Sequence, residues 1–96
     1  MKSLDEIKST LEENKAYLFS AYPIESLAIF GSYATQNQHE MSDLDLLVEF
    51  NNEIGIGFID LANELEKLIG FKVDLVSKNG IKKKYFETIN PDLIYV

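Results

Sequence analysis

The chain has 96 residues, of which 46% are hydrophobic, with no cysteine and a formal net charge of −7. This length suits one small domain, predicted over residues 1–96, and leaves no room for a second domain that selects a bulky substrate. The lack of cysteine excludes disulfides and thiolate metal sites, and the acidic charge argues against binding to a long nucleic acid.

The sequence contains neither an apolar run of about 20 residues that could span a membrane nor a secretory signal at its N-terminus. We therefore expect a cytoplasmic protein without membrane contact. All nine basic residues are lysines, so the planar donor of arginine is absent throughout the chain. Any phosphate would have to be bound by backbone N–H groups, metal ions or lysine side chains.

The N-terminal segment carries a capping box, Ser3 and Glu6, followed by apolar residues at helical spacing. This pattern predicts a helix of about five turns that ends before Pro23. The apolar run Ile24–Phe30 then predicts a buried strand, and Gly31 after it predicts a tight turn.

The middle of the chain alternates in the same way between helical and strand signals. We expect a short helix over 32–38, a polar loop over 37–42 and a second strand over Leu44–Phe50. The apolar residues of 58–69 recur at helical spacing until Gly70, which predicts a second long helix.

The C-terminal part predicts a third strand over 71–76, a turn at 79–80, a helix over 81–89 and a short last strand over 93–96. The fold class that follows is α/β (α+β), with a small mixed sheet and helices packed mainly on one of its faces.

Three aspartates carry the chemistry of this sequence. Asp43 and Asp45 are two residues apart at the entrance of a strand, so both project from one face while Leu44 and Leu46 face the core. Two such carboxylates can hold divalent ions that activate a nucleophile and neutralise a leaving phosphate. Asp74, among apolar residues of the next strand, is the candidate third ligand.

The turn after the first strand supplies the other half of the predicted site. Gly31 lets the backbone approach a phosphate closely, and Ser32 adds a hydroxyl donor beside unpaired N–H groups at the start of the expected short helix. A tight turn without function would look the same, so this feature matters only together with the aspartates. His39, in the polar loop, is expected to be solvated and is left out of the site.

The segments Phe30–Ser32, 42–48 and 73–76, with the spacing between them, resemble the polymerase-beta-type nucleotidyltransferase superfamily. The small size, the leading helix and the ending 92–96 resemble its minimal branch, the MNT antitoxins that partner HEPN-domain toxins. The likeness runs over nearly the whole chain.

The resemblance implies a polymerase-beta-like fold and a set of site residues. Asp43, Asp45 and Asp74 would bind two Mg²⁺ ions, with Mn²⁺ as an alternative, and Asp74 would also help to activate the attacking hydroxyl. Gly31 and Ser32 would hold the nucleoside triphosphate. It further implies an enzyme that transfers AMP from ATP to a tyrosine of a HEPN-family RNase toxin, within a possible hetero-oligomer.

One departure from the family pattern keeps other functions open. Many relatives place Arg-Gly after Ala34, where this chain has Thr35 and Gln36, and the lysines of 82–84 are a possible substitute. The alternative function is therefore a weak or inactive antitoxin that neutralises its partner by binding alone. Nucleotidyl transfer to a small molecule or an RNA end is less favoured because no accessory domain would select such a substrate.

Overall fold

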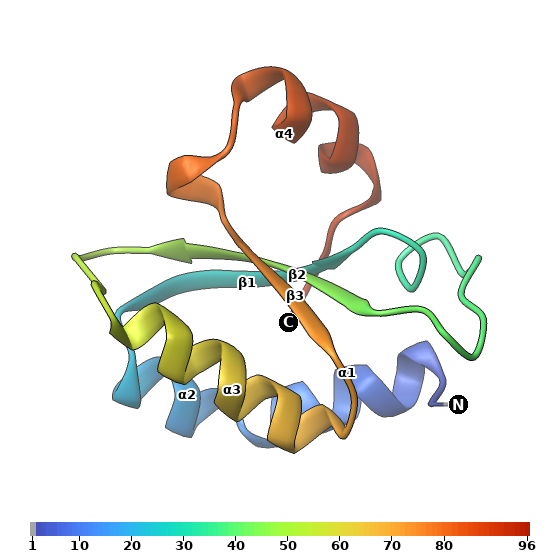
Figure 1. The fold of residues 1–96 in the computed structure, drawn as a ribbon, viewed down its shortest axis with the longest axis horizontal. Coiled ribbons are helices and arrows are strands. Elements are labelled where there is room, and N and C mark those ends of the chain that lie inside the picture. Colours follow the sequence, from blue (N-terminus) through green and yellow to red (C-terminus); the bar gives the residue numbers. More distant parts are fainter. Residues whose placement is uncertain (1) are drawn as a thin grey trace.

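A computed structural model describes residues 2–96, and Figure 1 shows the arrangement of its helices and strands. The helices are α1 (Leu4–Glu13), α2 (Lys15–Ala21), α3 (Gly57–Ile69) and α4 (Lys83–Ile89), with short 3₁₀ turns at Lys78–Gly80 and Asn90–Asp92. The strands are β1 (Ile24–Phe30), β2 (Leu44–Phe50), β3 (Val73–Ser77) and β4 (Ile94–Tyr95).

The strands form one mixed sheet in the order β3-β2-β1-β4. β1 is antiparallel to both β2 and β4, whereas β2 and β3 run parallel, with α3 between them in the chain. A parallel pair needs such a crossover because its second strand must start at the same end as its first. The mixed sheet predicted from the sequence is confirmed.

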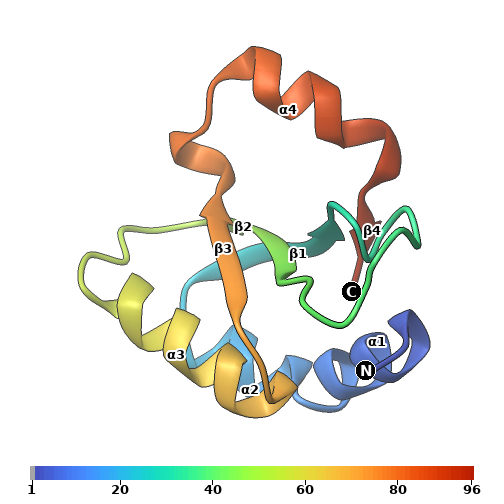
Figure 2. The same ribbon diagram turned by 45° about the vertical axis from the view of Figure 1, so that its right-hand side comes forward.

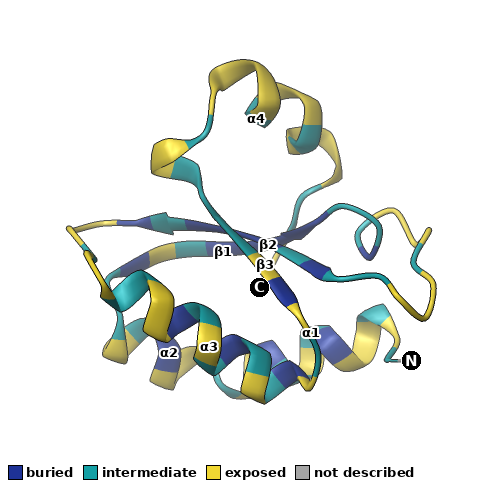
Figure 3. Cartoon of the chain, viewed as in Figure 1, coloured by how far each residue is buried: buried dark blue, intermediate teal, exposed yellow. Residues whose placement is uncertain are grey.

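Helices α1, α2 and α3 cover one face of the sheet, and α4 lies on the opposite side (Figures 1 and 2). The core between the three helices and the sheet contains fully buried residues from each layer. They include Ile7 and Leu11 of α1, Leu18 of α2, Leu61, Leu65 and Ile69 of α3, and Leu44, Leu46 and Val48 of β2. Figure 3 shows that α4 is mostly exposed, and it contributes no buried residue.

The first predicted helix is in fact two helices, separated at Asn14. The backbone of Asn14 leaves the helical conformation (φ −104°, ψ 2°), and its side-chain amide donates to the carbonyl of Thr10 at 2.8 Å. Asparagine competes with the helix in this way because its short side chain can bond to nearby backbone groups. The prediction of one uninterrupted helix was therefore wrong, although the capping box at Ser3 and Glu6 is present as expected.

The short helix predicted over 32–38 is also wrong, since these residues form turns. One α-helical hydrogen bond forms, from Thr35 N–H to Gly31 O at 3.1 Å, and a 3₁₀-type bond joins Gln36 N–H to Tyr33 O at 3.3 Å. Gln36 itself adopts a left-handed conformation (φ 58°). The N–H of Asn37 reaches back to Ser32 O at 2.8 Å and closes the segment after a single turn.

The remaining elements agree with the sequence-based predictions within a few residues. Helix α3 ends at Gly70, whose positive φ of 94° is the left-handed cap that glycine adopts most readily. β3 starts at Val73 rather than at residue 71, and β4 is only two residues long. Among the described residues, no helix combines the length and the apolar character needed to cross a membrane.

The capping box gives a test of how α1 begins. Ser3→Ala removes the hydroxyl that accepts from Glu6 N–H at 3.1 Å, and should lower the free energy of unfolding by about 1 kcal/mol. Ser9→Ala, on the exposed surface of the same helix, is the matched control and should be neutral or slightly stabilising. Urea denaturation measures both, and an equal effect of the two changes would contradict the cap.

Candidate active site

The three aspartates of the predicted site lie at one end of the sheet. Asp45 of β2 is paired in register with Asp74 of β3, and Asp43 comes two residues before Asp45. Leu44 and Leu46, which alternate with them, are buried in the core beneath the sheet. Side chains alternate along a strand, so the aspartates face the side of the sheet on which α4 lies (Figure 1).

The carboxyl of Asp45 is the most perturbed titratable group of this site. Burial is the main cause that raises its pKa from 3.8 to about 6, and the charge of Asp74, a hydrogen bond with Asp74 and the charge of Asp43 add to it. Like charges held together disfavour the ionised form. The three carboxyl groups thus share one electrostatic environment, although Asp74 itself is exposed to solvent.

The side chain of Asp43 also lies near a cation, since its Oδ2 is 3.9 Å from Nζ of Lys72. Within residues 2–96, no three Asp, Glu or His side chains are gathered tightly enough to enclose a metal ion in this structure. The pair Asp45 and Asp74, adjacent in register, nevertheless fits a divalent cation in type, because such an ion would relieve the repulsion that contributes to the raised pKa of Asp45. The full ligand set remains a prediction.

The turn after β1 is pressed against the acidic pair. Gly31 has a positive φ of 73°, and a Cβ built on it would overlap Oδ2 of Asp45. Cγ and Cβ of Asp45 lie 3.0 and 3.2 Å from the same point, so rotation of the carboxylate alone would not make room for a side chain. Glycine is needed here both for its backbone conformation and for the space that Asp45 fills.

The backbone donors of this turn are free to bind a ligand. In the described part of the chain, the N–H groups of Ser32, Tyr33 and Ala34 have no hydrogen-bond acceptor within the protein, as is usual for the first residues of a helical turn. Such N–H groups bind anions readily. The prediction of unpaired donors therefore keeps its physical basis, although the turn does not continue into a helix.

Tyr33 fixes the position of the turn, a role that the sequence reasoning missed. Its side chain is only 2% exposed, and its ring stacks on that of Phe71 with centroids 5.8 Å apart. Burial raises the pKa of its hydroxyl. A large aromatic residue inside an otherwise polar segment was the signal that could have identified this anchor.

Helix α4 borders the same face through an aromatic contact. The ring of Tyr85 meets that of Phe30 edge to face, with centroids 6.4 Å apart, and Phe30 is the register partner of Asp45.

The run Lys82–Lys84, a candidate substitute for the missing arginine, makes no ion pair with the aspartates in the described part of the chain. Its one ion pair among the described residues joins Lys83 to Glu87 at 4.0 Å.

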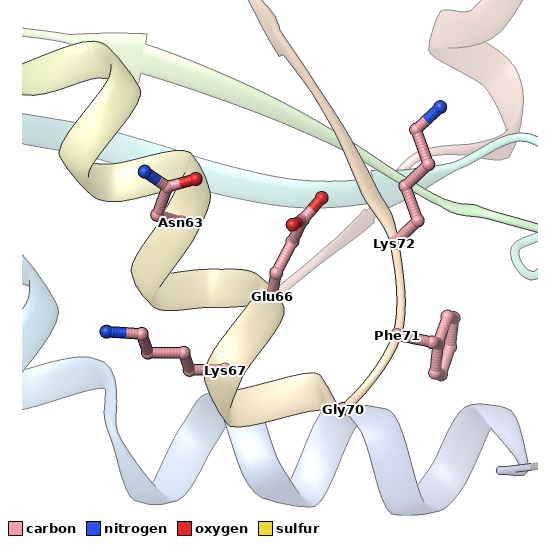
Figure 4. A pocket seen from close by; sticks show the side chains of 6 residues that line it. All are labelled: Asn63, Glu66, Lys67, Gly70, Phe71 and Lys72. Atoms are coloured by element: carbon pink, nitrogen blue, oxygen red, sulfur yellow. The ribbon is translucent and has the colours of Figure 1, made fainter.

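A hollow with a volume of about 650 Å³ lies elsewhere, at the end of α3. Figure 4 shows the residues that line it, which are Asn63, Glu66, Lys67, Gly70, Phe71 and Lys72. None of the three aspartates is among them, and at the acidic site Asp74 is exposed while Asp43 and Asp45 are partly buried. His39 is exposed, and its Nδ1 accepts from Met41 N–H at 3.2 Å within its own loop.

Comparison with known proteins places the chain among nucleotidyl-transferring enzymes. The family model described as polymerase beta, nucleotidyltransferase matches residues 5–94. A relative from Methanocaldococcus jannaschii, provisionally named a protein adenylyltransferase, is 45% identical over 98 residues that cover the whole of both chains. Protein adenylyltransferase MntA from Thermococcus cleftensis is 36% identical over 97 residues, which cover 100% of this chain and 98% of the relative.

Solved structures share the fold. One described as a minimal nucleotidyltransferase superposes with a TM-score of 0.81 at 31% identity and covers 97% of this chain and 95% of its own. A chain from the complex of tri-AMPylated Shewanella oneidensis HEPN toxin with MNT antitoxin superposes with a TM-score of 0.60, over 96% of this chain and 66% of that chain. Its identity is 19%, so this second likeness concerns the fold alone.

The contact between Gly31 and Asp45 can be separated from backbone strain. Gly55 also has a positive φ, 56°, but a Cβ there would meet nothing within 4 Å, so Gly55→Ala should cost about 1 kcal/mol from strain alone. Gly31→Ala adds a steric conflict and should cost about 1–3 kcal/mol more. Urea denaturation of the two variants tests this difference, and equal losses would argue against the close packing of Gly31 on Asp45.

The raised pKa of Asp45 predicts how the metal-free protein responds to pH. Its folded pKa of about 6 exceeds the ordinary 3.8, so the folded state binds the proton more tightly. The contribution of protonated Asp45 to the free energy of unfolding is fully present below about pH 4 and is lost as the pH rises through about 6. Asp45→Asn should remove this loss and raise the free energy of unfolding near pH 7.

We expect a gain of about 1 kcal/mol, well below the roughly 3 kcal/mol that a pKa of about 6 instead of 3.8 would give without screening, because solvent screens a carboxyl that is only partly buried. Asp92→Asn, at an exposed position, is the matched control and should keep the wild-type pH profile. Thermal unfolding in chelator across this pH range measures both variants. If Asp45→Asn kept the wild-type dependence of stability on pH, the raised pKa of Asp45 would be wrong.

Proposed function

The chain belongs to the polymerase beta nucleotidyltransferase family, and we propose that it is an antitoxin that transfers AMP from ATP to a tyrosine of a HEPN-family toxin. The observation that carries the proposal is the pairing of Asp45 with Asp74 beside the Gly31 turn. Carboxylates and the unpaired backbone N–H groups of the turn therefore lie close together. The adenylyltransferase names of relatives that match the whole chain support the reaction type.

The proposed reaction forms a bond between a tyrosine oxygen and the α-phosphorus of ATP while the bond to the departing pyrophosphate breaks. Asp43, Asp45 and Asp74 would hold two Mg²⁺ ions, which when bound lower the pKa of the hydroxyl and neutralise the leaving phosphates. Asp74, exposed at its strand, would accept the hydroxyl proton. The free N–H groups of the turn at Ser32 would hold phosphate oxygens.

An acceptor carried by another protein suits the open position of this site. Asp74 is exposed, and the large hollow at the end of α3 contains none of the three aspartates. Small-molecule sites are usually enclosed clefts that bury most of their ligand, whereas a side chain presented by a partner can approach an open face. The complex of an MNT antitoxin with an AMPylated HEPN toxin is the model for this partnership.

A second candidate function is an antitoxin that neutralises its partner by binding alone. It is favoured by the residues Thr35 and Gln36, which give this chain no cation where the family pattern that it resembles would place arginine and glycine. Loss of that cation would weaken binding of the triphosphate without disturbing the fold, because the turn is anchored by the buried Tyr33.

Intact-mass spectrometry of the co-encoded partner, incubated with the chain, ATP and Mg²⁺, tests the proposal. We expect the partner to gain the mass of one or more AMP groups with the wild-type chain and with Asp92→Asn. Asp45→Asn should reduce transfer by at least about 100-fold while keeping the folded structure, because a neutral amide is a much poorer ligand for Mg²⁺.

Each other outcome would overturn either the proposed transfer or its mechanism. A tight complex whose partner keeps its mass would support neutralisation by binding alone. Consumption of ATP without any partner would support a small acceptor. Wild-type transfer by Asp45→Asn would remove the aspartates from the mechanism.

A further inference from the structure

Lys72 lies beside the aspartates, although nothing in the sequence motif includes it. The N–H of Leu44 donates to the carbonyl of Lys72 at 3.1 Å, and Leu44 is the register partner of Val73. The residue before Leu44 is Asp43, and its Oδ2 is 3.9 Å from Nζ of Lys72. The end of the β2–β3 ladder therefore places a cation next to the first aspartate.

The direction of the Lys72 side chain agrees with this placement. Lys72 and Asp74 are two residues apart on the same segment, so they project towards the same face of the sheet. In Figure 4, the Lys72 side chain extends from the segment before β3 in a direction away from the side chain of Lys67. Its Nζ ends 3.9 Å from Oδ2 of Asp43, so its charged end lies beside the acidic site.

We propose that Lys72 binds the triphosphate of the nucleotide and so supplies the positive charge that the chain lacks after Ala34. The inference rests on the proposed function, because it assigns a residue within the same nucleotide site. The ligand class is a nucleoside triphosphate held through its β- and γ-phosphate oxygens, which a lysine ammonium neutralises as a point charge.

Lys72 is the lysine best placed for this role. The ion pairs of the described residues join Lys78 to Glu49, Lys83 to Glu87 and Lys72 to Asp43, and of these only the last involves a site aspartate. The chain has no arginine that could serve instead. The predicted substitute, the run Lys82–Lys84, makes no such contact.

The contact with Asp43 is weak enough to be exchanged. The two side chains are 74% and 44% exposed, and exposed ion pairs contribute about 1 kcal/mol or less. Asp43 cannot serve Lys72 and a divalent cation equally well, so a metal-loaded site releases the ammonium close to the bound phosphates. In the metal-free protein the same ammonium offsets the charge of Asp43.

A purely structural role makes different predictions. If Lys72 only offsets the repulsion among the aspartates, its loss would lower stability and strengthen Mg²⁺ binding, but it would change the affinities for ATP and AMP equally. If Lys72 binds the outer phosphates, its loss weakens the binding of ATP. The binding of AMP, which lacks those phosphates, stays nearly unchanged. The ratio of the two affinities separates the roles.

Titration calorimetry with ATP and with AMP, each in saturating Mg²⁺, tests the proposal on four proteins: wild type, Lys72→Gln, Lys72→Arg and Lys67→Gln. We expect Lys72→Gln to weaken ATP binding by about 10-fold and AMP binding by less than about 2-fold. Lys72→Arg should stay within about 3-fold of wild type, because it keeps the charge. Lys67→Gln removes the same charge from an exposed position on α3 and should change neither affinity.

The outcomes distinguish failure of this inference from failure of the proposed function. If wild type binds ATP but Lys72→Gln keeps the wild-type ratio of ATP to AMP affinity, Lys72 is not a phosphate ligand and the proposed function stands. If Lys67→Gln weakened ATP binding as much as Lys72→Gln does, the effect would come from the net charge of the protein and not from a contact between Lys72 and phosphate, and the inference would be wrong. If wild type binds no ATP, both the inference and the proposed enzyme are overturned.

Discussion

The site depends on the close approach of the Asp45 carboxyl to Asp74 on one side and to Gly31 on the other. The approach is unfavourable for the metal-free protein, because burial and neighbouring negative charge both raise the pKa of Asp45. The sheet maintains it through ladder hydrogen bonds and through the buried leucines that alternate with the aspartates. The packing of the core thus holds like charges close together, in a position where a cation could bind them.

The arrangement of layers explains how so small a domain keeps its chemistry accessible. Three helices fill one face of the sheet with apolar side chains, so the opposite face is left for the aspartates and the mostly exposed α4. The turn at Gly31 is held from below by Tyr33, which reaches into the core. One end of the sheet can therefore remain open to a partner while its supporting residues stay rigidly packed.

The corrections to the predicted fold share a physical cause. The segment 32–38 has helix-compatible residues, yet it stops after one turn because Gln36 turns left-handed and Asn37 bonds back to Ser32. Asn14 interrupts the first helix through its own side chain. In both places a local hydrogen bond competes with a weak helical preference, and sequence patterns of apolar residues do not register such bonds.

The sequence by itself determined the strands around the site, the long helix ending at Gly70 and the three aspartates, because alternation and residue spacing are local properties. It also carried the family likeness. Only the tertiary structure decided that Asp45 lies opposite Asp74, that Gly31 has no room for a side chain and that Lys72 stands beside Asp43. Those facts depend on strand register and on contacts between distant segments, which are set when the whole core packs together.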